Sequence, residues 1–226
     1  MPLRPLAATI LDRLTEIYER ERNPVRAAPM VAYMRDQFAY LGLPAPLQRT
    51  LNREVLAGLP RPSELDLADI ATACWARPER EYQYFACTLL RRDVGGCSAK
   101  FLGLVRGLIV DKSWWDTVDT LASRVVGPLV VAHPRLVATM DAWAEEDNLW
   151  LTRTAILHQL FRKSETDSEQ LFRYCTLQSG HRDFFIRKAI GWALREYAKT
   201  DPEAVRAFVA TTPLSPLSAR EALRRI

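Results

Sequence analysis

Ile186-Arg-Lys-Ala-Ile-Gly-Trp-Ala-Leu-Arg-Glu-Tyr197 is the stretch of this chain that decides the fold. Its apolar residues recur three and four positions apart, which is the spacing of one face of an α-helix. Segments with the same pattern run along the chain between glycine and proline stops. No alternating strand pattern with a hairpin turn competes, so the sequence predicts an all-α protein. The apolar stripe comprises Ile186, Ala189, Ile190, Ala193, Leu194 and Tyr197.

A weak repeat of 34 residues links this stretch to earlier ones. Ala155-Ile156 matches Ala189-Ile190 at this spacing, and Asp119, Arg153 and Arg187 follow one another at the same interval. Small residues at a fixed helical position, with a period in the thirties, favour stacked antiparallel helix pairs. Such superhelical arrays present a concave face, on which the three charged residues would occupy equivalent positions. An irregular helical bundle is the alternative.

Composition sets the outer limits on function. The chain has 226 residues, 48% hydrophobic and 26% charged, which indicates a globular protein with one large domain or two small ones. The net charge of +4 permits nucleic-acid binding without demonstrating it. Most of the basic residues are arginine, which favours bidentate contacts with phosphate.

Cysteine and histidine usage argues against a metal site. The four cysteines form no CxxC pair, and the three histidines include no HExxH motif. Free thiols of this kind fit a reducing compartment. No signal-peptide pattern or membrane-length apolar run is present. The sequence therefore predicts a cytoplasmic protein with no metal, no cofactor and no membrane association.

Lys112-Ser-Trp-Trp-Asp-Thr-Val-Asp119 concentrates two tryptophans and two carboxylates in the start of a predicted helix. We expect Ser113 to be its N-cap and Asp116 to lie in its first turn, near the positive end of the helix dipole. Trp115 and Asp119 are one turn apart and would share a face. An aromatic plane beside a carboxylate can recognise a cation, such as a sugar with developing positive charge. The alternative is that both tryptophans are core and both aspartates are cap and surface residues.

Two further groups of residues suggest an anionic partner. Arg153 lies inside an apolar segment whose helix begins at Asp147 or Asn148, so its guanidinium needs an anion or carbonyls. It is either a phosphate clamp or half of a salt bridge with a neighbouring carboxylate. Basic residues surround Trp192 in the sequence, and a basic face with an exposed aromatic ring suits binding to a nucleic-acid backbone. The ordinary alternative is that Trp192 lies in the core and the charged residues face solvent. The charges on that face are Arg182, Arg187, Lys188, Arg195 and Lys199.

Together, long stretches of this chain resemble the AlkD-type DNA alkylation repair enzymes, which are bacterial alkylpurine DNA glycosylases built from HEAT-like helical repeats. The resemblance covers essentially the whole chain in order and implies a single domain over residues 1–226. The matching stretches are Lys112–Asp119, Asp147–Arg153, Lys188–Lys199, Met30–Met34, Pro78–Glu81 and Pro216–Ala222.

The resemblance implies excision of positively charged N3- and N7-alkylated purines from duplex DNA, without flipping the base into a pocket. The catalytic aspartate of the family falls on Asp119, and the arginine that accompanies it falls on Arg153. The aromatic residues that cup the sugar and backbone fall on Trp115, Trp192 and Tyr33. Arg49 matches a DNA-contacting arginine, but its segment Pro44–Arg49 departs from the family pattern at Ala45 and Gln48, which puts contacts with the opposite strand in doubt. The candidate DNA-binding residues are therefore Tyr33, Arg49, Lys112, Arg187, Lys188 and Arg195.

The implied partner is double-stranded DNA that contains alkylated purines. We expect the protein to be a monomer and to associate with the bacterial nucleoid when it acts. Two other functions stay open at this point. Some relatives of the family bind branched DNA without glycosylase activity, and many helical arrays are protein-binding scaffolds.

Overall fold

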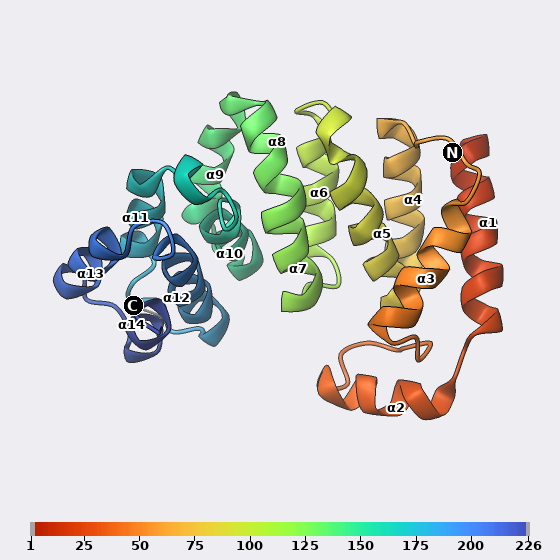
Figure 1. Cartoon of the computed structure of the whole chain (residues 1–226), viewed down its shortest axis with the longest axis horizontal. Coiled ribbons are helices and arrows are strands. Elements are labelled where there is room, and N and C mark those ends of the chain that lie inside the picture. Colours follow the sequence, from red (N-terminus) through yellow and green to blue (C-terminus); the bar gives the residue numbers. More distant parts are fainter. Residues whose placement is uncertain (1–2, 225–226) are drawn as a thin grey trace. The chain divides into compact units, whose positions relative to one another are not determined.

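The computed structural model describes residues 3–224, and its regular structure is helical (Figure 1). Its contacts divide the chain into two compact units, Met1–Cys97 and Ser98–Ile226. Within residues 3–224 there is no strand, and one isolated bridge pairs Ala39 with Glu79. The prediction of an all-α fold is confirmed.

The first unit packs helices around a core of aromatic rings. α1 packs against α3 and α4, and α4 packs against α5. Tyr18 of α1 lies with its ring centroid 5.5 Å from that of Tyr82, and its hydroxyl donates to Asn52 over 2.6 Å. The elements are α1 (Pro5–Arg20), α2 (Pro24–Tyr33), α3 (Ala45–Leu56), α4 (Glu64–Ala76), α5 (Arg80–Asp93) and a 3-10 turn (Val94–Gly96).

A buried carboxylate fixes the loop before α3. Glu81 accepts hydrogen bonds from the successive amides of Leu41, Gly42 and Leu43 at 2.9, 2.9 and 3.1 Å. Gly42 adopts φ +89°, and a Cβ there would lie 2.2 Å from a backbone oxygen of α2's N-cap, so only glycine fits. This loop sets where α3, which carries Arg49, begins.

The second unit contains a long helical run that changes its winding. α7 (Trp115–Leu121), a π-helical turn (Ala122–Val126) and α8 (Gly127–Ala132) follow one another without a break. Single π turns inside α-helices occur frequently at functional sites. The other elements are α6 (Phe101–Val110), a 3-10 turn (Pro134–Leu136), α9 (Val137–Ala144), α10 (Leu149–Leu157), a 3-10 turn (Lys163–Glu165), α11 (Ser168–Leu177), α12 (Phe184–Tyr197), α13 (Pro202–Thr211) and α14 (Pro216–Ala222).

Hydrogen bonds between residues 34 positions apart recur inside both units. The Tyr18 hydroxyl meets Asn52 in the first unit, and in the second Arg153 binds Asp119 and Gln178 binds the Ala144 carbonyl. A fixed separation of this kind arises when successive helix pairs stack in register. The prediction of stacked helix pairs is confirmed.

α12 is buried along the predicted stripe and crossed by the last helix. Its stripe residues are buried, apart from Tyr197, which is half-buried. α12 and α14 are in contact with each other. At the crossing, a Cβ on Gly191 would lie 2.5 Å from the Glu221 Cβ and 3.0 Å from the Ser218 carbonyl oxygen. Glycine at position 191 is therefore what allows the two helices to approach so closely.

Candidate active site

Within the tryptophan-rich stretch Lys112–Asp119, α7 begins one residue later than the sequence predicts. Trp114, with extended backbone angles, is the N-cap, and Trp115 is the first helical residue. The Ser113 hydroxyl donates to the Ile109 carbonyl over 2.6 Å. The prediction of Ser113 as N-cap is wrong, because its hydroxyl binds the last turn of the preceding helix. Asp116 does lie in the first turn.

Asp119 and Arg153 form a two-pronged ion pair between α7 and α10. Arg153 Nε donates to Asp119 Oδ1 over 2.7 Å, and Nη2 donates to Oδ2 over 2.8 Å. The side chains are only 5% exposed for Arg153 and 15% for Asp119. Of the two interpretations of Arg153, the structure shows the salt bridge with a neighbouring carboxylate.

The same guanidinium also binds α12. Arg153 Nη1 donates to the Phe185 carbonyl, an oxygen in the first turn of α12. Arg153 therefore ties three helices together, and it fixes the Asp119 carboxylate relative to α12. The helix that carries it begins after Asn148, whose side chain accepts from the amides of Trp150 and Leu151, as the sequence predicts.

Burial shapes the acidity of the carboxyl group. Desolvation raises the pKa of Asp119 above its ordinary value, while the hydrogen bonds and charge of Arg153 act in the opposite direction. Each carboxylate oxygen carries two lone pairs, and Arg153 engages each oxygen once. The remaining lone pairs can accept a proton from water or face a cation.

A cluster of aromatic rings that sequence reasoning did not assign lies at the N-terminal ends of the three helices that Arg153 joins. Trp114 packs 6.0 Å from Trp150 and 5.1 Å from Phe185 between ring centroids, and Trp150 and Phe185 are also 5.1 Å apart. Trp150 precedes Arg153 by three positions on a helix, which places both on one face. That spacing is the signal by which this cluster could have been found.

The two tryptophans predicted for the site lie on two of the three helices that Arg153 joins. Trp115 lies one turn before Asp119 on α7, and Trp192 lies two turns after Phe185 on α12. Both side chains are half-buried. The hydrogen bonds thus unite Asp119, Arg153 and the start of α12, and the two tryptophans extend from the same elements.

The candidate DNA-binding residues differ in their surroundings. In the second unit, Lys188 and Arg195 pair with Glu221 of α14. Arg187 donates through Nε to the His181 carbonyl over 2.8 Å, so it takes no part in the Asp119–Arg153 pair. Lys112 precedes α7 and adopts φ +47°.

In the first unit, Tyr33 is 72% exposed at the end of α2, and Arg49 is exposed on α3. Gln48, where the segment departs from the family pattern, is buried and donates to the Glu81 carbonyl over 3.0 Å. Gln48 therefore serves the fold of this unit, whereas Arg49 and the exposed Ala45 face solvent.

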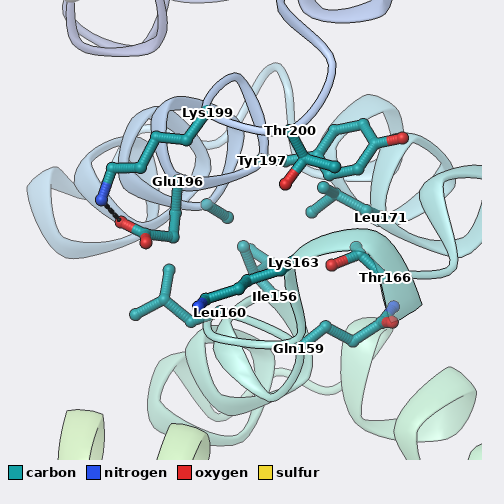
Figure 2. Close-up of a pocket in the computed structure, with 11 residues that line it drawn as sticks. Ile156, Gln159, Leu160, Lys163, Thr166, Leu171, Glu196, Tyr197, Lys199 and Thr200 are labelled. Atoms are coloured by element: carbon teal, nitrogen blue, oxygen red, sulfur yellow. Dashed lines mark hydrogen bonds and ion pairs between the residues drawn. The ribbon is translucent and has the colours of Figure 1, made fainter.

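A separate cavity of about 210 Å³ lies elsewhere in the second unit, between the end of α10 and α12 (Figure 2). Its wall combines apolar side chains with Lys163 and with a Lys199–Glu196 ion pair of 2.6 Å. None of the predicted site residues lines it. Across residues 3–224 no cluster of histidine, cysteine and acidic residues could hold a metal ion. No helix in the same range has the length and apolarity needed to span a bilayer.

The described residues thus form an all-α fold of stacked helix pairs in which Arg153 anchors the Asp119 carboxylate. The sequence pattern of the family described as DNA alkylation repair enzyme matches residues 14–226. A solved structure named "Predicted DNA alkylation repair enzyme from Enterococcus faecalis" is similar, with 33% identity and a TM-score of 0.83. The similarity covers 91% of this chain and 97% of that one. No curated protein matches.

This chain therefore belongs to the DNA alkylation repair enzyme family, and its role lies in the repair of alkylated DNA.

Proposed function

We propose that this protein is a DNA glycosylase that excises cationic N3- and N7-alkylated purines from duplex DNA, as the first step of base excision repair. The observation that carries the proposal is the Asp119 carboxylate, held at both oxygens by Arg153. The start of its helix meets the start of α12 through the rings of Trp114 and Phe185. The substrate is bound as duplex, without insertion of the base into a pocket.

The chemistry requires few parts. An alkylated purine already carries a positive charge and departs neutral, so no general acid is needed. As the N-glycosidic bond breaks, the sugar acquires oxocarbenium character. A fixed carboxylate stabilises that charge, and it can orient water and take its proton. Asp119 performs both tasks in this proposal.

The neighbouring residues position the sugar and the backbone. The faces of Trp115 and Trp192 stabilise the cationic sugar by about 0.5 to 2 kcal/mol for a good contact. Arg153 has five N–H donors, of which its protein partners engage one on each nitrogen. In this proposal the two remaining N–H groups donate to a phosphate next to the lesion, which orients the sugar against Trp115 and Trp192.

The direct test is to identify the bases released from methylated duplex DNA. We expect 7-methylguanine and 3-methyladenine to appear by liquid chromatography and mass spectrometry, with a matching number of abasic sites. The unmethylated duplex serves as the control and should release no base. Salt-dependent DNA binding without any base release would contradict the proposal.

A non-catalytic binder of branched or damaged DNA is the second candidate. It is favoured by the burial of Asp119 and by the engagement of both its oxygens, since such an ion pair can serve the fold alone. The base-release assay separates the two candidates, because this binder would leave alkylated bases in the duplex.

The pH dependence of excision provides an independent prediction. The reaction needs Asp119 as an anion, and burial raises the pKa of this group. The excision rate should therefore fall as the pH is lowered through that pKa, and the fall should begin at a higher pH than for an ordinary aspartate of pKa about 3.9. Single-turnover rates between pH 4 and 8, corrected for spontaneous base loss, measure this. If the excision rate of Asp119→Asn fell over the same acidic pH range as that of wild type, the assignment of this titration to Asp119 would be contradicted.

A further inference from the structure

The last helix places a carboxylate against the basic residues of α12. Glu221 Oε1 lies 3.2 Å from the Lys188 ammonium nitrogen, and Oε2 accepts from Arg195 Nη1. The Glu221 side chain is 12% exposed, compared with 36% for Lys188 and 21% for Arg195. One anion is therefore shared between two cations that line the same helix.

These cations belong to a half-buried row on α12. Phe185, Lys188, Trp192 and Arg195 follow one another at steps of three and four, so they share one face of the helix. Glu221 thus lies along the row that contains Trp192 and begins beside the Arg153 contact.

The backbone that carries this carboxylate is held close to α12. α14 crosses α12 at Gly191, where the two helices approach too closely for any side chain at that position. The Ser218 hydroxyl of α14 also donates to the Arg187 carbonyl over 2.9 Å. These contacts keep the Glu221 backbone close to α12, within reach of Lys188 and Arg195.

Glu221 is an anion at neutral pH. Burial acts to raise its pKa, but the hydrogen bonds and charges of Lys188 and Arg195 together lower it below the ordinary value. A DNA phosphate that approaches either cation must therefore compete with a carboxylate already bound. Cations that are neutralised inside the protein contribute less to the counterion release that drives binding to DNA.

We propose that Glu221 is an internal competitor for phosphate, which holds Lys188 and Arg195 in ion pairs and limits the affinity of the α12 face for duplex DNA. The inference relies on the proposed function only for DNA as the partner. The limit applies to any sequence, because phosphate contacts carry no base information.

The test compares Glu221→Gln with wild type in binding to an undamaged duplex between 50 and 200 mM salt. Each cation released to a phosphate should steepen the slope of log Kobs against log salt by about 0.9, or about 1.8 for both. Over this salt range the loss of affinity should then exceed that of wild type by about threefold per cation. Affinity at low salt should also be higher for Glu221→Gln.

Glu203→Gln is the matched control. It makes the same change in net charge, on a carboxylate that is 80% exposed and pairs with Arg206 on α13. Equal slopes for the two variants, or weaker binding by Glu221→Gln, would overturn the inference. So would an unchanged effect of Glu221→Gln in a Lys188→Met/Arg195→Met background.

A second measurement covers the case in which Glu221→Gln does not fold. This measurement compares Lys188→Met/Arg195→Met with wild type, both with Glu221 present. Loss of two phosphate contacts that no carboxylate opposes would reduce the salt slope by about 1.8. Because Glu221 already neutralises both cations, we expect a clearly smaller reduction. A full loss of about 1.8 contradicts the competition. Absence of DNA binding by the wild-type protein would contradict the proposed function itself, whereas an unchanged slope in Glu221→Gln contradicts only the role of Glu221.

Discussion

Replacing Asp119 by asparagine is expected to slow base excision by about 100- to 1,000-fold, the cost of losing one well-placed charge-stabilising group. Asparagine keeps the shape of the side chain and one acceptor for Arg153, but it has no charge to oppose the cationic sugar. DNA affinity should be nearly unchanged, because no phosphate contact is lost. Single-turnover excision of 7-methylguanine and fluorescence anisotropy measure the two quantities.

Asp116→Asn is the control for this variant. It makes the same charge change three residues earlier on α7, in the first turn of the helix. We expect its excision rate to stay within about fivefold of wild type, since a first-turn carboxylate contributes only about 0.3 to 1 kcal/mol. Excision by Asp119→Asn at the rate of Asp116→Asn would remove Asp119 from the mechanism.

Replacing Arg153 by methionine should reduce the free energy of unfolding by about 3 to 5 kcal/mol, because it leaves Asp119 buried without its partner. The third contact of the guanidinium, with the Phe185 carbonyl, is lost as well. Urea unfolding followed by circular dichroism gives the change. The midpoint of thermal unfolding should fall by roughly 10 °C for a chain of this size.

The double variant Asp119→Leu/Arg153→Met separates the stability of this pair from its chemistry. Replacement of a buried ion pair by apolar residues of similar volume is often neutral or stabilising. We therefore expect the double variant to recover most of the stability lost in Arg153→Met while excision is as slow as in Asp119→Asn. A double variant as unstable as the single one would show that the pair itself stabilises the fold. Excision by the double variant at the wild-type rate would contradict the proposed mechanism.

The sequence by itself determined the helical class and the spacing of the repeat. The stripe of Ile186–Tyr197 records helical periodicity, which depends on neighbours three and four positions away along one element. The 34-residue interval between Asp119 and Arg153 also proved to be a real separation between contacting side chains. The assignment of these two residues to a catalytic site remains a prediction from the resemblance and the proposed chemistry.

Only the tertiary structure decided which partners the charged and aromatic side chains take. In the folded protein Arg153 binds Asp119 and the Phe185 carbonyl, and Trp114 packs near Trp150. Glu221 forms ion pairs with two cations of α12. The sequence could not specify these contacts, because they depend on how closely separate helices approach and in which direction each side chain leaves its helix. The crossing at Gly191 is the plainest case, since a missing side chain on one helix determines where a carboxylate on another can lie.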